Sequence, residues 1–116
     1  MIRGNDRVFR VHGVNEHLGE IEAYLRNKVD TWCENHVIGN GFAARDLIGG
    51  KYKDWNGTPL QVLYNHYLQR RHGDVLYAYR EAAKAAGRIL KGVLKRDAAH
   101  TFLITRDYKT IRYELV

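Results

Sequence analysis

Residues 74–96 read DVLYAYREAAKAAGRILKGVLKR, and this stretch carries two patterns at once. Its apolar side chains recur every three or four residues, which predicts one helix from about Val75 to Arg96. Asp74 stands at the position of a helix N-cap, and Gly73 separates this helix from the segment before it. The predicted buried face comprises Val75, Leu76, Tyr79, Ala83, Ala86, Leu90, Val93 and Leu94.

The second pattern is a row of basic side chains on the same helix: Arg80, Lys84, Arg88, Lys91 and Lys95. At about 100° per residue they fall within an arc about 80° wide. Within residues 80–96 only Glu81 is acidic. An ordinary solvated helix face is charged too, but it usually mixes both signs. We interpret the one-sided row as a contact for a line of phosphates, whose neutralisation releases bound counterions.

Residues 101–116, TFLITRDYKTIRYELV, follow this helix and predict a β-hairpin. Apolar side chains alternate along both halves, with Phe102 and Ile104 on the first and Ile111, Tyr113 and Leu115 on the second. The sequence RDYK separates the halves, so we expect a basic tip at Arg106 and Lys109.

Upstream, the apolar spacing predicts two further helices and a short mixed segment. The first helix is expected from about Asn15 to His36, with an apolar stripe formed by Leu18, Ile21, Leu25, Val29, Trp32 and Cys33. Residues 42–48 are expected to form an extended residue or two and then a turn of helix. Thr58 as N-cap and Pro59 at the first helical position predict the next helix. Its stripe is Leu60, Leu63, Tyr64, Tyr67 and Leu68.

The whole chain therefore predicts a mainly helical α+β fold, with three to four helices followed by a C-terminal hairpin. Its 116 residues suit a single domain, expected over residues 15–116 after an N-terminal arm, residues 1–14, with room for a short strand. The single cysteine, Cys33, and the lack of an apolar targeting or membrane-spanning segment favour a reducing, cytoplasmic location with no membrane partner.

The charge balance of the chain favours the same class of partner as the basic row. Nineteen Lys and Arg against thirteen Asp and Glu give a formal net charge of +6. The excess lies entirely after residue 37, because residues 1–37 hold five basic and six acidic side chains. A field of this sign favours polyanions or acidic protein surfaces.

The order of these segments resembles a winged helix-turn-helix domain: helix, short extended piece, helix, helix with AAKAAGRILKGVLKR, then a terminal hairpin. The resemblance implies that the helix before the hairpin lies in the major groove of double-stranded DNA and that the hairpin, the wing, touches the backbone or the minor groove. By position, Arg80, Lys84, Arg88 and Lys91 would then be recognition-helix residues, and Arg106 and Lys109 wing residues.

Secondary candidates lie in the loop at residues 51–57, where Lys51, Lys53 and Trp55 combine cations with an aromatic ring that could stack on unpaired bases. The alternative is that Trp55 packs over the edge of the core. The six histidines lack metal-ligand spacing, and no nucleotide or nucleophile motif occurs, so we expect no cofactor, no metal and no enzymatic activity.

Two functional hypotheses follow. The first is a nucleic-acid binder or regulator; the sequence leaves open DNA against RNA, and the resemblance favours double-stranded DNA. The second is a small inhibitor or adaptor, of the kind phages and mobile elements encode, which uses the basic surface to block an acidic or nucleic-acid-binding site on a larger protein. A homodimer is compatible with either hypothesis.

Overall fold

The computed structural model describes residues 1–4, 7–49, 54–107 and 110–116. Within these ranges the chain is an α+β protein with four α-helices and a four-stranded mixed sheet. In chain order the elements are β1 (Ile2–Arg3), the 3-10 helix η1 (Asn15–His17), α1 (Leu18–Glu34), β2 (Gly41–Ala43), α2 (Ala44–Ile48), α3 (Gln61–Arg70), α4 (Val75–Lys95), β3 (Phe102–Asp107) and β4 (Thr110–Leu115).

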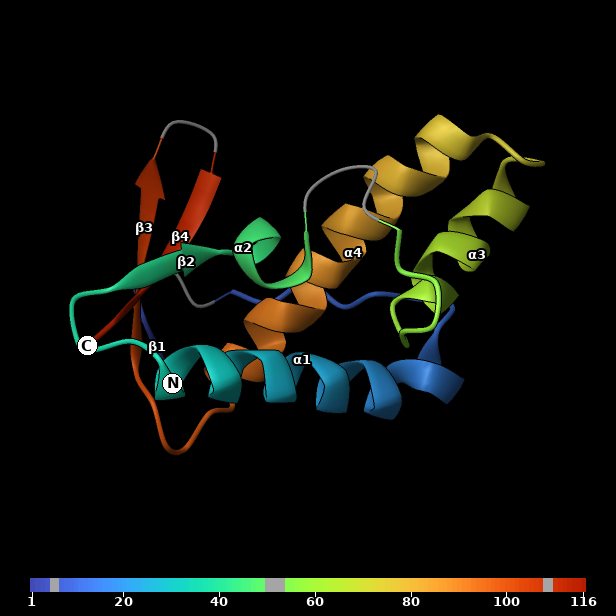
Figure 1. The fold of residues 1–116 in the computed structure, drawn as a ribbon. Helices are drawn as coiled ribbons and strands as arrows, with labels where there is room; N and C mark the ends of the chain where they lie inside the picture. The colour runs from blue at the N-terminus through green and yellow to red at the C-terminus, as the bar shows by residue number, and fades with distance from the viewer. Residues whose placement is uncertain (5–6, 50–53, 108–109) are drawn as a thin grey trace.

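The central element is α4, which runs diagonally between α3 at one end of the molecule and the sheet at the other (Figure 1). The predicted N-cap is confirmed, because the Asp74 side chain accepts a hydrogen bond of 3.0 Å from the backbone N–H of Tyr77. Both α1 and α3 pack on α4. The long helix predicted from residues 74–96 is therefore the element around which the others are arranged.

The predicted buried face of α4 is partly wrong. Val75 and Leu76 are each 50% exposed, and Tyr79 and Ala83 are only half-buried. The residues that are buried are mostly small: Ala78, Ala82, Ala85, Ala86, Ile89, Leu90, Gly92, Val93 and Leu94. Alanine lets neighbouring helices approach closely, so the contact face of α4 is centred on its small residues and not on its largest ones. This contact face lies nearly opposite the basic row.

The sheet has the order β1-β3-β4-β2. The predicted hairpin is confirmed as the antiparallel pair β3 and β4, with Ile104 opposite Tyr113. The arm contributes β1, parallel to β3, and the short extended piece contributes β2, antiparallel to β4. Phe42 of β2 meets Phe102 and Tyr113 with ring centroids 5.7 Å apart in both cases, so strands far apart in sequence share one aromatic core.

The other helices lie where the apolar spacing predicts them, with one correction. Ile21, Leu25 and Val29 are the fully buried residues of α1, and α2 follows β2 directly. Thr58 does not act as an N-cap. Its hydroxyl donates instead to the Trp55 carbonyl oxygen at 2.8 Å, and α3 begins at Gln61 after a tighter turn. Trp55, whose carbonyl oxygen accepts this hydrogen bond, is itself buried.

The arm packs on the domain at both of its ends. Ile2, Val11 and Val14 are buried in the core cluster. Gly13 has a φ of +88°, and a Cβ atom built there would lie 2.5 Å from Cε1 of His66 on α3. The close approach of the arm to α3 therefore requires glycine at this position. No helix in the described part of the chain is both long and apolar enough to cross a membrane.

We expect Gly13→Ala to lower the free energy of unfolding by about 2 to 4 kcal/mol, because it combines an unfavourable positive φ with overpacking against His66. Gly73→Ala is the matched control, since Gly73 has a φ of +87° but open space around a built Cβ. Urea denaturation of both variants measures the difference. Equal losses would show that the His66 contact costs nothing.

Candidate nucleic-acid interface

The basic row of α4 is at the surface. Arg80, Lys84, Arg88 and Lys95 are exposed, and Lys91 is half-buried. The packed face of α4 fixes this orientation, because burying its small residues turns the opposite face toward solvent. The predicted orientation of the row toward the surface is therefore confirmed, with Lys91 the least exposed of the five side chains.

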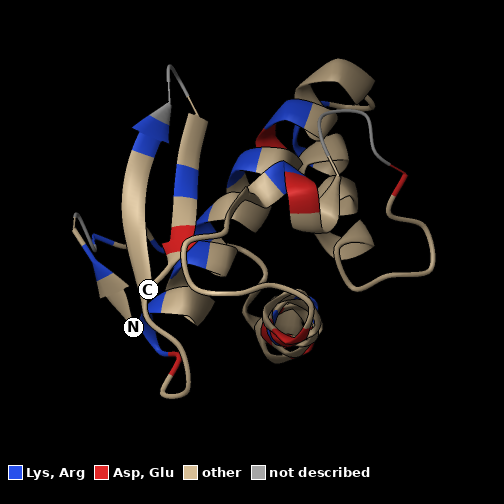
Figure 2. Ribbon diagram, turned by 60° about the vertical axis from the view of Figure 1, so that its left-hand side comes forward, with Lys and Arg blue, Asp and Glu red and all other residues tan. Residues whose placement is uncertain are grey.

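Three cations of the row line a hollow of about 540 Å³ between α4 and the hairpin. Lys84, Arg88 and Lys91 lie on its α4 side, and Arg106 of β3 lies on its hairpin side. Arg45 of α2 completes the set, so three elements bring five cations to one groove. Figure 2 shows the blue Lys and Arg segments on α4 and on the hairpin strands. We call this hollow the basic groove.

Among the described residues, the charged side chains that line the basic groove are all positive. Its remaining described residues are apolar or uncharged: Phe9, Ala43, Ala44, Gly87, Thr110, Ile111 and Tyr113. Burial raises the pKa of Tyr113 to about 12, so the phenol stays neutral at physiological pH. Opposed cations around a partly enclosed hollow concentrate positive potential there, because the protein walls exclude high-dielectric solvent.

Within the described part of the chain, the acidic Glu81 pairs with a cation of the groove. Its Oε1 lies 3.3 Å from Nζ of Lys84. Exposed pairs of this kind contribute little, at most about 1 kcal/mol, so Lys84 remains available to a stronger anion. At Lys84, the positive charge of the row is therefore partly offset by Glu81.

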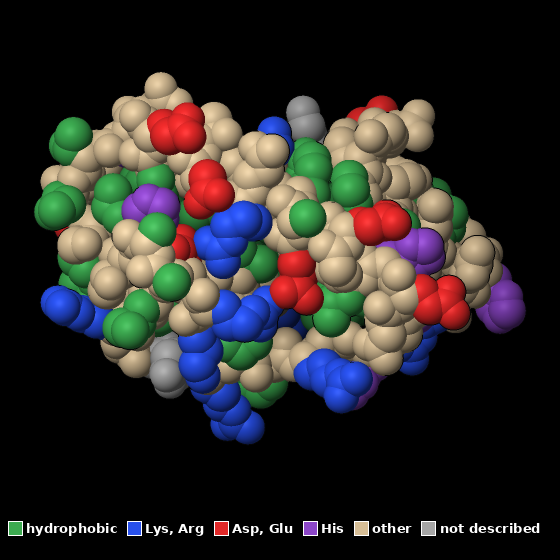
Figure 3. Space-filling view, turned by 90° about the horizontal axis from the view of Figure 1, so that it is seen from below, with side chains coloured by type: hydrophobic (Ala, Val, Ile, Leu, Met, Phe, Trp, Pro, Cys, Tyr) green, Lys and Arg blue, Asp and Glu red, His purple; other side chains and the backbone are tan. Residues whose placement is uncertain are grey.

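Other surfaces of the molecule have mixed charge. The face seen from below interleaves acidic, basic and histidine side chains (Figure 3). A larger, open hollow of about 740 Å³ beside α1 and α2 includes Glu20, Lys28 and Asp46 in its lining. Neither surface has the one-sided positive charge of the described lining of the basic groove.

The remaining sequence candidates fall outside the groove. Arg80 and Lys95 are exposed on α4 but are not among the groove residues. Lys51, Lys53 and Lys109 lie outside the described residues. Trp55 is only 7% exposed, and its Nε1 donates to the Ile48 carbonyl oxygen at 2.9 Å. Of the two interpretations of Trp55, packing against the core is confirmed and stacking on bases is wrong, because the ring is part of the core.

The sequence reasoning missed two groove residues. Arg45 lies on a five-residue helix whose position depends on the pairing of β2 with β4. Phe9 lies on the arm and is 54% exposed, with the Arg7 guanidinium carbon 4.8 Å from its ring centroid. The only signal for Phe9 was the run RVFR at residues 7–10, where an apolar ring stands among cations.

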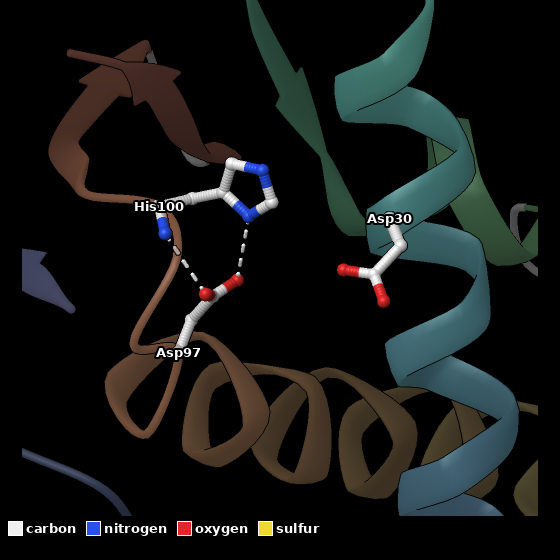
Figure 4. A group of neighbouring side chains, drawn as sticks. All are labelled: Asp30, Asp97 and His100. Carbon is white, nitrogen blue, oxygen red and sulfur yellow. Dashed lines mark hydrogen bonds and ion pairs between the residues drawn. The ribbon is translucent and has the colours of Figure 1, made fainter.

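A second group of titratable side chains lies away from the groove, where α1 meets the loop after α4. Ligand atoms of Asp30, Asp97 and His100 lie within 4.8 Å of one another (Figure 4). Asp97 is buried and accepts four hydrogen bonds: from Arg26 at 2.8 Å, from the backbone N–H groups of Ala99 and His100, and from Nδ1 of His100 at 3.1 Å. Both of its oxygens are fully used, so the group holds the loop in place.

The environment of Asp97 lowers its pKa. Burial alone would raise this pKa, but the hydrogen bonds from His100 and Ala99, together with the charge of Arg26, outweigh it. The carboxylate therefore stays ionised and joins α1 to the end of α4. It also sits near Cys33, whose pKa is raised to about 11 by burial and by the charges of Asp97 and Asp30.

No protein-family model, curated protein or solved structure matches this chain. The function is therefore inferred from the geometry and charge of its own residues.

We expect acid to destabilise the protein partly through Asp97. Its folded pKa lies below the unfolded value of about 3.9, so its stabilising effect is complete above that pH and is lost as the pH falls through the folded value. Asp97→Asn should lower the free energy of unfolding by about 2 kcal/mol at pH 7 and flatten the loss below about pH 4. Urea denaturation across pH, with Glu34→Gln on the exposed surface as control, tests this; parallel curves for Asp97→Asn and wild type would contradict it.

We expect Cys33 to react slowly with thiol reagents. A pKa of about 11 leaves about a hundredfold less thiolate at pH 8 than an ordinary exposed thiol with a pKa of 9.0 would have. Labelling with iodoacetamide should therefore be slow in the native protein and become fast in denaturant. Fast labelling of the native protein would show that the thiol is accessible and activated.

Proposed function

We propose that this protein binds nucleic acid through the basic groove. The observation that carries the proposal is the convergence of Arg45, Lys84, Arg88, Lys91 and Arg106 on one hollow with no acidic residue among its described lining. Positive side chains brought together from three elements repel one another, which costs free energy unless an anion joins them. A sugar–phosphate backbone supplies regularly spaced anions of that kind.

The arrangement of elements supports the same proposal. The resemblance to winged helix-turn-helix domains rests on the order of the elements. From α1 onward the chain has a helix, a short strand, further helices and a hairpin. In this protein α4 and the hairpin, the counterparts by order of the recognition helix and the wing, form the two main walls of the basic groove. Phosphate contacts of this type position a nucleic acid but do not read its sequence.

Neutralising three of the five groove cations should weaken binding strongly. We expect the triple variant Lys84→Gln, Arg88→Gln, Lys91→Gln to lose roughly a hundredfold in affinity for nucleic acid at low salt. It should also lower the slope of log Kd against log salt by about 3, because each lost phosphate contact removes about one released counterion. Fluorescence anisotropy with labelled duplex DNA, single-stranded DNA and RNA over a salt series measures both quantities.

The matched control removes the same charge elsewhere: Lys28→Gln, Arg70→Gln, Arg71→Gln, all exposed and outside the groove. It should keep the wild-type slope. An equal loss in both triple variants would mean that net charge alone drives association. Absence of wild-type binding to all three probes at low salt would overturn the proposal, and binding to an acidic protein would then be tested by pull-down.

A further inference from the structure

An exposed aromatic ring stands at the edge of the basic groove. Phe9 is 54% exposed, although the residues around it in the arm are anchored: Val11 is buried and Val8 is half-buried. Val8 Cγ1 lies 3.5 Å from the place that a Cβ atom on Gly92 would take, an ordinary van der Waals distance, so the arm packs against α4 here. The ring is thus held outward by a packed segment.

Phe9 lines two hollows. One is the basic groove, and the other is a smaller hollow of about 220 Å³ whose lining includes Ile89 and Gly92 of α4. Arg88 also lines both hollows, and the acidic Glu22 lines the smaller one. A ligand in the basic groove would therefore lie beside the phenyl ring.

The ring is accompanied by cations that also suit a nucleic acid. The guanidinium carbon of Arg7 lies 4.8 Å from the ring centroid, and that of Arg88 lies 6.0 Å from it. Aromatic rings and arginine planes both stack on bases, while further cations hold the phosphates. Because both guanidinium groups lie over the Phe9 ring, a base that stacks there displaces one of them or stacks on its plane, and the displaced cation can pair with a phosphate.

We propose that Phe9 is a stacking platform for an unpaired base, so that the groove takes a single-stranded segment of nucleic acid. This proposal rests on the proposed function. Two features favour a single strand over a duplex. The cations Lys84, Arg88 and Lys91 line a hollow, whereas entry into a major groove requires a projecting element. A base offers its face to Phe9 only when it has left its own stack.

The test measures anisotropy of labelled strands of about 12 nucleotides, within the usual range for such sites. The probes are oligothymidine, a duplex of equal length and an abasic sugar–phosphate strand of equal length. The proteins are wild type, Phe9→Ala, Phe9→Trp and Ile38→Ala, the last removing an apolar side chain that is 75% exposed and outside the groove. Circular dichroism confirms that each variant is folded.

We expect Phe9→Ala to weaken oligothymidine binding by about tenfold to a hundredfold, since a single base stack is lost. Its salt slope should not change, because no charge is removed. Phe9→Trp should stay within about twofold of wild type, and Ile38→Ala should match wild type, because the indole still stacks and Ile38 is outside the groove. Wild type and Phe9→Ala should bind the abasic strand equally.

Two results would overturn the stacking proposal and leave the proposed function intact: equal oligothymidine affinity in wild type and Phe9→Ala, or an equal loss on the abasic strand. In both cases the groove triple variant would still lose binding. Absence of wild-type binding to every probe at low salt would overturn both proposals together.

Discussion

Close packing against the alanine face of α4 is the constraint on which the rest of the structure depends. Ala82, Ala85 and Ala86 are almost completely buried, so α1 and α3 can approach the helix axis more closely than large side chains would allow. Leu90 and Leu94 extend the same face toward the sheet. Because this face is buried, the opposite face of α4, which carries the cations, is turned toward solvent.

The basic groove follows from that orientation. On its own, α4 would carry its five cations on one side without a hollow around them. Here the hairpin and α2 are packed beside it, and they add Arg106 and Arg45 to the same hollow. Repulsion between these charges opposes the arrangement, and the packing of α4 and the aromatic contacts of β2, β3 and β4 offset it. The groove is thus a site held in place by contacts made elsewhere.

Polar contacts hold the loop after α4 and the strand β1 in place. Asp97 connects Arg26 of α1 with the loop that leads from α4 to β3, through hydrogen bonds to both of its oxygens. The Met1 ammonium donates to the carbonyl oxygens of Leu94, Asp97 and His100, which places β1 beside β3. The arm that leaves β1 then passes α4 and presents Phe9 at the groove, so a buried carboxylate and a strand pairing contribute to the geometry of a surface site.

The local pattern of the sequence determined the helices and strands whose formation depends on residues close together in the chain. The period of residues 74–96, the Asp74 cap and the alternation in residues 101–116 predicted α4 and the hairpin, and the spacing of the cations predicted one basic face. The tertiary structure decided what depends on residues distant in sequence. It paired β1 with β3 and β2 with β4, buried Trp55, left Val75 and Leu76 exposed, and brought Arg45 and Phe9 to the groove. The physical reason is that helix caps and periodicity act within a few turns of the chain, whereas burial and strand pairing are set by whichever distant surface an element meets.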